Sequence, residues 1–76
     1  MYKFAGIIIN STSVALDRMF TYMVPLNIYD KISIGSRVTV PFGKGNKTIQ
    51  GFVTELFFDD EKPEGVKDII SLCDEF

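Results

Sequence analysis

The residues with the clearest capacity for binding chemistry lie in one glycine-rich, basic stretch, Gly43-Lys44-Gly45-Asn46-Lys47. Glycine adopts the positive φ angles of tight turns and lets a ligand approach the backbone closely. Two ammonium groups beside exposed backbone N–H donors suit an anion such as a phosphate. The same composition also suits the solvated tip of a β-hairpin that binds nothing.

A nucleoside triphosphate site of the P-loop kind is not supported by this stretch. The motif G-x-x-x-x-G-K-[ST] would require glycines at positions 41 and 46 ahead of Lys47 and Thr48. Those positions hold Pro41 and Asn46. The stretch also leads into a predicted strand, so no helix N-terminus is available to bind the phosphates.

Catalytic and metal-binding arrangements are also poorly supported. The chain has no histidine, which removes the commonest general base and the Ser–His and Cys–His pairs. Four carboxylates gather at positions 59, 60, 61 and 64, beside a proline and a glycine. Their spacing matches no EF-hand, and a solvated acidic loop is the simpler interpretation. We therefore expect no catalytic residue and no metal site.

The totals describe one small globular domain with an uneven charge. The 76 residues are 46% hydrophobic and 24% charged, with a formal net charge of −2 that argues against indiscriminate nucleic-acid binding. Residues 1–50 carry six basic and two acidic residues, whereas residues 51–76 carry two basic and eight acidic ones. This asymmetry indicates a directed surface, although ordinary charged loops would also produce it.

The single cysteine, Cys73, cannot form a disulfide within the chain, which favours a reducing, cytoplasmic environment. We expect Cys73 to be a small buried apolar residue. The apolar run Ile7-Ile8-Ile9 is too short to span a membrane.

Alternating apolar and polar residues predict an all-β domain. The alternation is clearest where Val38, Val40 and Phe42 precede the basic stretch, and Pro25 should end an earlier strand because proline lacks an N–H. The predicted strands span residues 2–10, 19–25, 37–42, 48–57 and 66–72, with a short extended piece at 32–35. About five to six strands hide their edges best as a small curled sheet or half-open barrel.

The connecting segments carry the turn signals. We predict a turn at 10–13, a loop or single helical turn at 14–17, a loop with a short helical turn at 26–31 and an acidic loop at 58–65. Gly43 and Gly45 should reverse the chain after Phe42. Gly51, in the middle of the return strand, predicts a bulge, a bend or a close approach by another backbone.

The chain is rich in aromatic residues, with seven phenylalanines and three tyrosines. Most must fill the core of so small a domain, but an exposed ring could stack on a nucleobase. On the pattern alone, the simpler interpretation is that Phe20, Tyr22 and Phe42 pack in the core. Lys67 is then an ordinary surface charge.

Three segments change that balance: Arg18-Met19-Phe20-Thr21-Tyr22-Met23-Val24-Pro25, Gly35-Ser36-Arg37-Val38-Thr39-Val40-Pro41-Phe42-Gly43-Lys44 and Gln50-Gly51-Phe52-Val53. Together they resemble the N-terminal domain of the bacterial replication restart helicases of the PriA family. The family pattern is R-x-F-x-Y-x-x-P, then G-x-R-V-x-V-P-F-G, then a glycine-bearing strand. Order and spacing agree across nearly the whole chain.

The resemblance implies that residues 1–76 form a single DNA-binding domain, an N-terminal fragment of a larger helicase. Such a domain recognises the 3′ end of the nascent leading strand at stalled or branched replication forks. ATP and zinc would belong to downstream domains, so this chain itself should be no enzyme and need no cofactor. Other primosome or replication proteins are further partners that the resemblance allows.

The resemblance also implies a pocket for the terminal nucleotide. The family's aromatic residue corresponds to Phe20, its glycine to Gly43 and its lysine to Lys67, with Lys44 and Lys47 as further phosphate contacts. The family's acidic residue is replaced by Thr21, which can accept a hydrogen bond from a 3′-hydroxyl but carries no charge. We therefore expect weaker discrimination between 3′-hydroxyl and 3′-phosphate ends. The rival interpretation is a protein-docking or structural β-domain that positions the helicase motor.

Overall fold

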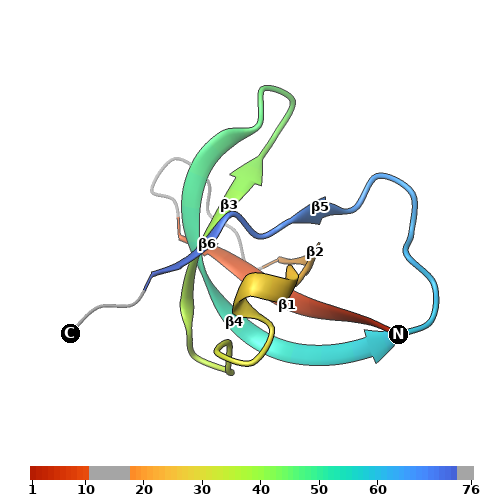
Figure 1. The fold of residues 1–76 in the computed structure, drawn as a ribbon. Coiled ribbons are helices and arrows are strands. Elements are labelled where there is room, and N and C mark those ends of the chain that lie inside the picture. Colours follow the sequence, from red (N-terminus) through yellow and green to blue (C-terminus); the bar gives the residue numbers. More distant parts are fainter. Residues whose placement is uncertain (11–17, 74–76) are drawn as a thin grey trace.

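A computed structural model describes residues 1–10 and 18–73 of the chain (Figure 1). The described residues form β1 (Tyr2–Asn10), β2 (Met19–Met23), the 3-10 helix η1 (Leu26–Ile28), β3 (Arg37–Phe42), β4 (Lys47–Asp59), β5 (Lys67–Asp68) and β6 (Ser71–Cys73). The predicted all-β class and the helical turn after Pro25 are confirmed. The predicted turn after Asn10 and the segment 14–17 lie outside the described residues. Among those residues, no helix is long and apolar enough to cross a membrane.

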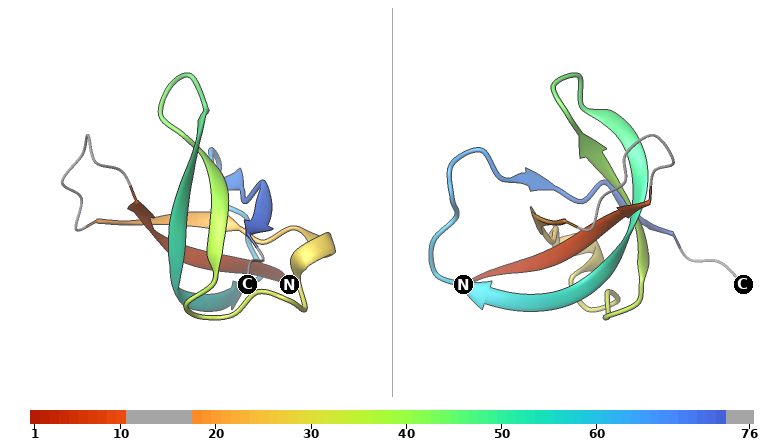
Figure 2. Two further views of the ribbon diagram at one scale, coloured as in Figure 1. Left: turned by 90° about the vertical axis from the view of Figure 1, so that its left-hand side faces the viewer. Right: turned by 180° about the vertical axis from the view of Figure 1, so that it is seen from behind.

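All of the described strands join one curled sheet with the order β5-β2-β1-β4-β3-β6. The long strand β4 curves through the middle and pairs antiparallel with both β1 and β3 (Figure 2). β1 also pairs antiparallel with β2. The first and last strands in this order, β5 and β6, are neighbours in sequence. A single short segment therefore forms both ends of the sheet.

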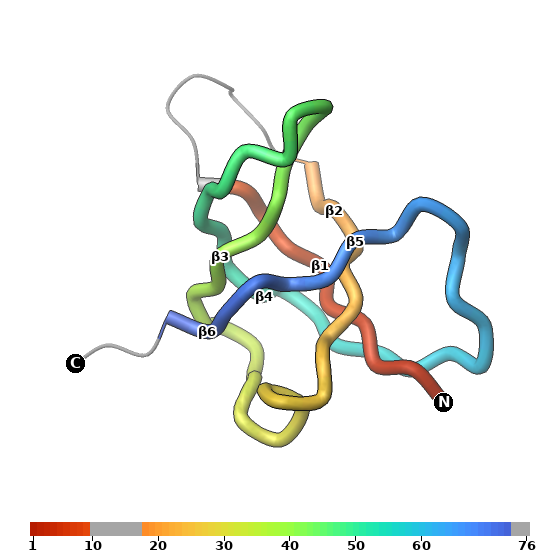
Figure 3. The backbone as a smooth tube through the Cα atoms, turned by 45° about the horizontal axis from the view of Figure 1, so that its top comes forward, coloured from red at the N-terminus to blue at the C-terminus, as the bar shows by residue number. Residues whose placement is uncertain are grey.

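Residues 67–73, which we call the closing segment, cross from β2 to β3 (Figure 3). Lys67 and Asp68 pair parallel with β2, and residues 71–73 pair antiparallel with β3. Between them, the N–H of Ile69 donates to the carbonyl of Met23 at 3.0 Å, and the N–H of Ile70 donates to the carbonyl of Thr39 at 2.8 Å. The sheet is therefore a half-open barrel whose two edges are bridged by residues 67–73.

The prediction of one continuous last strand over residues 66–72 was wrong. The segment must change partners between β2 and β3, so its ladder breaks at Ile69 and Ile70. The side chain of Ile69 is buried in the core at this point, whereas Ile70 is exposed. The imperfect alternation of this stretch reflects that change of partner.

Several smaller predictions also need correction. Residues 33–36 form a turn rather than an extended piece, because Gly35 has a φ of 96° and the N–H of Ser36 donates to the carbonyl of Ser33 at 3.0 Å. In the hairpin after β3, Gly43 has the expected positive φ of 78°, but the second positive φ, 51°, belongs to Asn46 and not to Gly45. β4 continues to Asp59, so the acidic loop begins later than predicted. Cys73 is half-buried rather than buried.

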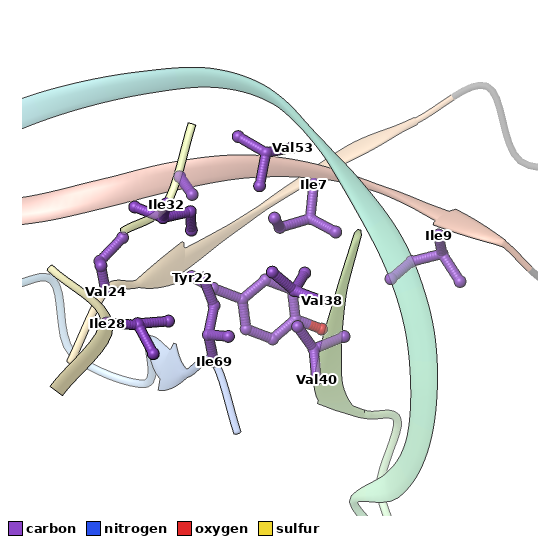
Figure 4. Close-up of a cluster of buried hydrophobic side chains, with 11 residues drawn as sticks. Ile7, Ile9, Tyr22, Val24, Ile28, Ile32, Val38, Val40, Val53 and Ile69 are labelled. Carbon is purple, nitrogen blue, oxygen red and sulfur yellow. The ribbon is translucent and has the colours of Figure 1, made fainter. Parts of the chain in front are cut away.

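The main core lies inside the curve of the sheet (Figure 4). The ring of Tyr22 lies among Val38, Val40 and Ile69, which come from β3 and the closing segment. The alternation predicted for β3 is thereby confirmed, because Val38 and Val40 both face the core, and on β2 it is the face of Tyr22 that points inward. Burial of each such aliphatic side chain contributes about 1.5–3 kcal/mol.

A second, smaller apolar group lies on the outer face. Phe4 is only 1% exposed, yet it is not a member of the main core cluster. Its neighbour Ala5 is buried in that cluster, and successive strand residues face opposite sides of a sheet. The ring of Phe4 stacks on Phe57, its partner on β4, with centroids 5.5 Å apart. β1 is thus buried on both faces at Phe4 and Ala5.

Gly51 marks a close approach between strands rather than a bulge. A Cβ atom there would lie 2.5 Å from Cγ2 of Ile7 and 2.7 Å from the carbonyl oxygen of Ile8. The register shift lies nearby: Gly6 pairs with Glu55 but Ile7 pairs with Val53, so Thr54 is the extra residue. The Thr54 hydroxyl donates to the carbonyl of Gly6 at 3.1 Å.

We expect Gly51→Ala to lower the free energy of unfolding by about 1–3 kcal/mol, since the added methyl group must displace the backbone of β1. Gly45→Ala is the matched control, because no atom lies within 4 Å of the Cβ position there and its φ is not positive. Urea unfolding followed by circular dichroism measures both. Equal midpoints for the two variants would contradict the close contact.

Candidate functional site

A pocket of about 350 Å³ lies where β2, the β3–β4 hairpin and the chain entering β5 meet. We call it the lysine pocket, and its lining residues are Phe20, Thr21, Tyr22, Phe42, Gly43, Gly65, Val66 and Lys67. The four residues predicted as the principal site, Phe20, Thr21, Gly43 and Lys67, all belong to it. They come from three segments that are far apart in the sequence.

Lys67 enters the pocket from β5, where it pairs with Tyr22 of β2. Its Nζ donates a hydrogen bond to the carbonyl oxygen of Gly43 at 3.0 Å. The positive φ of Gly43 belongs to the turn that presents this carbonyl. An ammonium group has three N–H donors, so this bond leaves donors for a ligand. The site thus places one cation beside a backbone turn.

The aromatic wall of the pocket is built from Phe20 and Phe42. Their rings meet edge to face, with centroids 5.2 Å apart and an interplanar angle of 80°. Both side chains are partly buried and pack against the core cluster. The guanidinium carbon of Arg18 lies 5.3 Å from the centroid of Phe20, within the range of a cation–π contact. Phe20 therefore supports the core and also borders the pocket.

Tyr22 ties the pocket to β3. Its hydroxyl donates to the carbonyl of Pro41 at 2.8 Å. Burial raises the pKa of this phenol above its ordinary value of 10.0, because desolvation disfavours the phenolate. The phenol acts as a neutral donor within the fold and is no candidate for acid–base chemistry at neutral pH.

Lys44 and Lys47 are not part of the pocket lining. Both are exposed on the hairpin, and of the basic stretch only Gly43 borders the lysine pocket. The residues that the sequence interpretation did not assign are Tyr22, Phe42, Gly65 and Val66. The Pro63-to-Gly65 turn was the one local signal for the last two, since it indicates a sharp change of direction before β5.

A second pocket of about 400 Å³, the acidic pocket, lies on the outer face. It is lined by Phe4, Thr21, Phe57, Asp59, Pro63, Glu64, Gly65 and Val66. Three of these residues, Thr21, Gly65 and Val66, also line the lysine pocket, so the two pockets adjoin. In the part of the chain that the structure describes, no group of three or more acidic or cysteine side chains could hold a metal ion.

Two comparisons with known proteins point to the same family. Residues 6–76 match the profile of a family described as the 3′ DNA-binding domain of PriA. The chain is 38% identical over 73 residues to the replication restart protein PriA of Bacillus subtilis, which covers 95% of this chain but 9% of that relative. The chain thus spans about one tenth of the relative's length. No solved structure shows significant similarity to it.

The buried phenol of Tyr22 predicts a loss of stability at alkaline pH. Its folded-state pKa is raised, so the unfolded chain loses this proton first as the pH rises. The contribution is therefore complete below about pH 10 and is lost as the pH rises through the raised pKa. Tyr22→Phe should lower the free energy of unfolding by about 1 kcal/mol at neutral pH, because the hydrogen bond to Pro41 is lost.

The same substitution should flatten the decline in stability above pH 10 that urea unfolding measures in the unaltered chain. Tyr29→Phe serves as the control, because it removes a phenol while leaving Tyr22 in place. An unchanged alkaline decline in Tyr22→Phe would contradict this assignment.

Proposed function

Because the chain belongs to the family of PriA 3′ DNA-binding domains, we propose that it binds the 3′ end of a DNA strand in the lysine pocket. The strand in question is the nascent leading strand at a stalled or branched replication fork. The chain would serve as the DNA-binding module of a larger ATP-dependent helicase that acts in replication restart. Other primosome proteins would act with that larger protein.

The observation that carries the proposal is the convergence of Phe20, Thr21, Gly43 and Lys67 on one pocket. Each has a distinct task there. The ammonium of Lys67 attracts a phosphate as a point charge, and the hydroxyl of Thr21 accepts a hydrogen bond from the terminal 3′-hydroxyl. Gly43 carries no side chain that would block the strand, and Phe20 offers an apolar edge to the terminal sugar or base.

The size and charge of the pocket favour one nucleotide over a long stretch of backbone. Its volume of about 350 Å³ lies at the lower end for small-molecule pockets. Among the residues that the structure describes, Lys67 is the one lysine or arginine that lines it. Few phosphates should therefore be neutralised on binding, and affinity should fall with salt along a shallow slope. Lys44 and Lys47 on the hairpin would add attraction that is independent of sequence.

A binding experiment with partial duplexes tests the proposal. One duplex carries a free 3′-hydroxyl and its match carries a bulky 3′ block, and fluorescence anisotropy gives the dissociation constants at several salt concentrations. The proposal requires tighter binding of the free end. Equal affinity for both duplexes would refute it and would favour a protein-docking domain.

Lys67→Met should weaken binding of the free 3′ end by about tenfold to a hundredfold, because a hydrogen bond to a charged group contributes about 1.5–3 kcal/mol. Lys44→Met is the matched control, since it removes the same charge from the hairpin outside the pocket. Because an exposed charge contributes little, we expect this variant to change the dissociation constant by less than about twofold. Urea unfolding should accompany both, because Lys67 also bonds to Gly43. A larger effect of Lys44→Met than of Lys67→Met would contradict the assignment.

Thr21→Asp should increase the preference for a 3′-hydroxyl over a 3′-phosphate about five- to tenfold, because a carboxylate accepts the hydroxyl proton and repels the phosphate. Thr21→Asn separates shape from charge, as asparagine has the size of aspartate without its negative charge. The ratio of the two dissociation constants is the readout. If Asn raised that ratio as much as Asp, charge at this position would not be the cause.

A further inference from the structure

We propose that Asp59 and Glu64 of the acidic pocket supply the negative charge that disfavours a 3′-phosphate end. The inference rests on the proposed function, because it concerns which strand ends the lysine pocket admits. Thr21 itself has no charge, so any electrostatic discrimination must come from neighbouring residues. The two carboxylates line the acidic pocket, which shares Thr21, Gly65 and Val66 with the pocket that Lys67 lines.

The sheet places Asp59 on the same face as Thr21. On β1, Gly6 pairs with Thr21, and Phe4 pairs with both Met23 and Phe57. Alternate residues of a strand share a face, so Thr21 and Met23 lie on one side with Phe57 and, two residues further, Asp59. That side is the outer face where Phe4 is buried. Asp59 thus borders the far end of the surface that begins at Thr21.

The loop after β4 brings Glu64 back to the same surface. One carboxylate oxygen of Asp59 accepts a hydrogen bond from the backbone N–H of Glu61 at 3.1 Å, at the start of this loop. The loop then reaches Glu64, directly before Gly65, which lines both pockets. Both carboxylates are exposed, and exposed carboxylates are negatively charged at neutral pH.

A strand end that occupies the lysine pocket would therefore meet opposite charges on its two sides. Its internal phosphate would face the ammonium of Lys67. Any group attached to the terminal 3′ oxygen near Thr21 would face Asp59 and Glu64. A hydroxyl is neutral there, whereas a terminal phosphate carries a charge of about −1.5 to −2 and is repelled. This repulsion acts through solvent, so added salt should weaken it. The Debye length is about 10 Å at an ionic strength of about 0.1 M and becomes shorter as salt is added.

The test compares three partial duplexes that differ only in the terminal group: a 3′-hydroxyl, a 3′-phosphate or an uncharged 3′-O-methyl. The 76-residue chain is compared with Asp59→Asn, Glu64→Gln and the double variant. Asp30→Asn is the control, since it removes one exposed carboxylate that lines neither pocket. Fluorescence anisotropy gives each dissociation constant, and urea unfolding reports whether each variant is folded.

We expect the unaltered chain to prefer the hydroxyl over the phosphate. Each single variant should reduce this preference about threefold and the double variant about tenfold, as expected for partly screened charges near a surface. In these variants, the affinity for the hydroxyl and O-methyl ends should change by less than about twofold, because neither end carries a terminal charge. Asp30→Asn should leave the preference for the hydroxyl unchanged. Raising the salt should shrink the preference of the unaltered chain and have little effect in the double variant.

The outcomes separate this inference from the proposed function. If the hydroxyl end binds well but the phosphate penalty is absent, or is the same in the folded double variant, the carboxylates are not the selector and only this inference fails. If a free 3′-hydroxyl confers no advantage over a bulky block, the proposed function fails and this inference falls with it.

Discussion

The fold depends on closure of the sheet by residues 67–73. Without this segment, the remaining four strands in the order β2-β1-β4-β3 would expose the edges of β2 and β3, together with the apolar side chains between them. The closing segment hydrogen-bonds to both edges and buries Ile69 beside Tyr22, Val38 and Val40. Tyr22 strengthens the same junction from within, because its hydroxyl reaches Pro41 of β3.

The same closure builds the candidate site. The chain must pass the edge of β2 to enter β5, and in doing so it carries Gly65, Val66 and Lys67 past Thr21. One side of this passage holds the ammonium of Lys67, and the other holds the carboxylates of the acidic pocket.

Much of the fold follows from local pattern, and the errors occur where distant segments decide. Alternation alone predicts that Val38 and Val40 share one face of β3, and the structure buries that face in the core. It does not predict the break at Ile69 and Ile70, which depends on two partners distant in sequence. Family motifs identified Phe20, Gly43 and Lys67, but no local signal places Asp59 and Glu64 in the same pocket as Thr21. Their position depends on the register of β4 and on the loop that follows it.

The hydrogen bond between Lys67 and Gly43 has a consequence for the energetics of occupancy. A lysine side chain loses about 1.5–2 kcal/mol of rotamer freedom when it is fixed in place. Here part of that loss occurs on folding, because the carbonyl of Gly43 already orients the ammonium. Two N–H donors then remain for an incoming group, which need not order the side chain again. The carbonyl of Gly43 therefore holds the ammonium of Lys67 in position before any ligand binds.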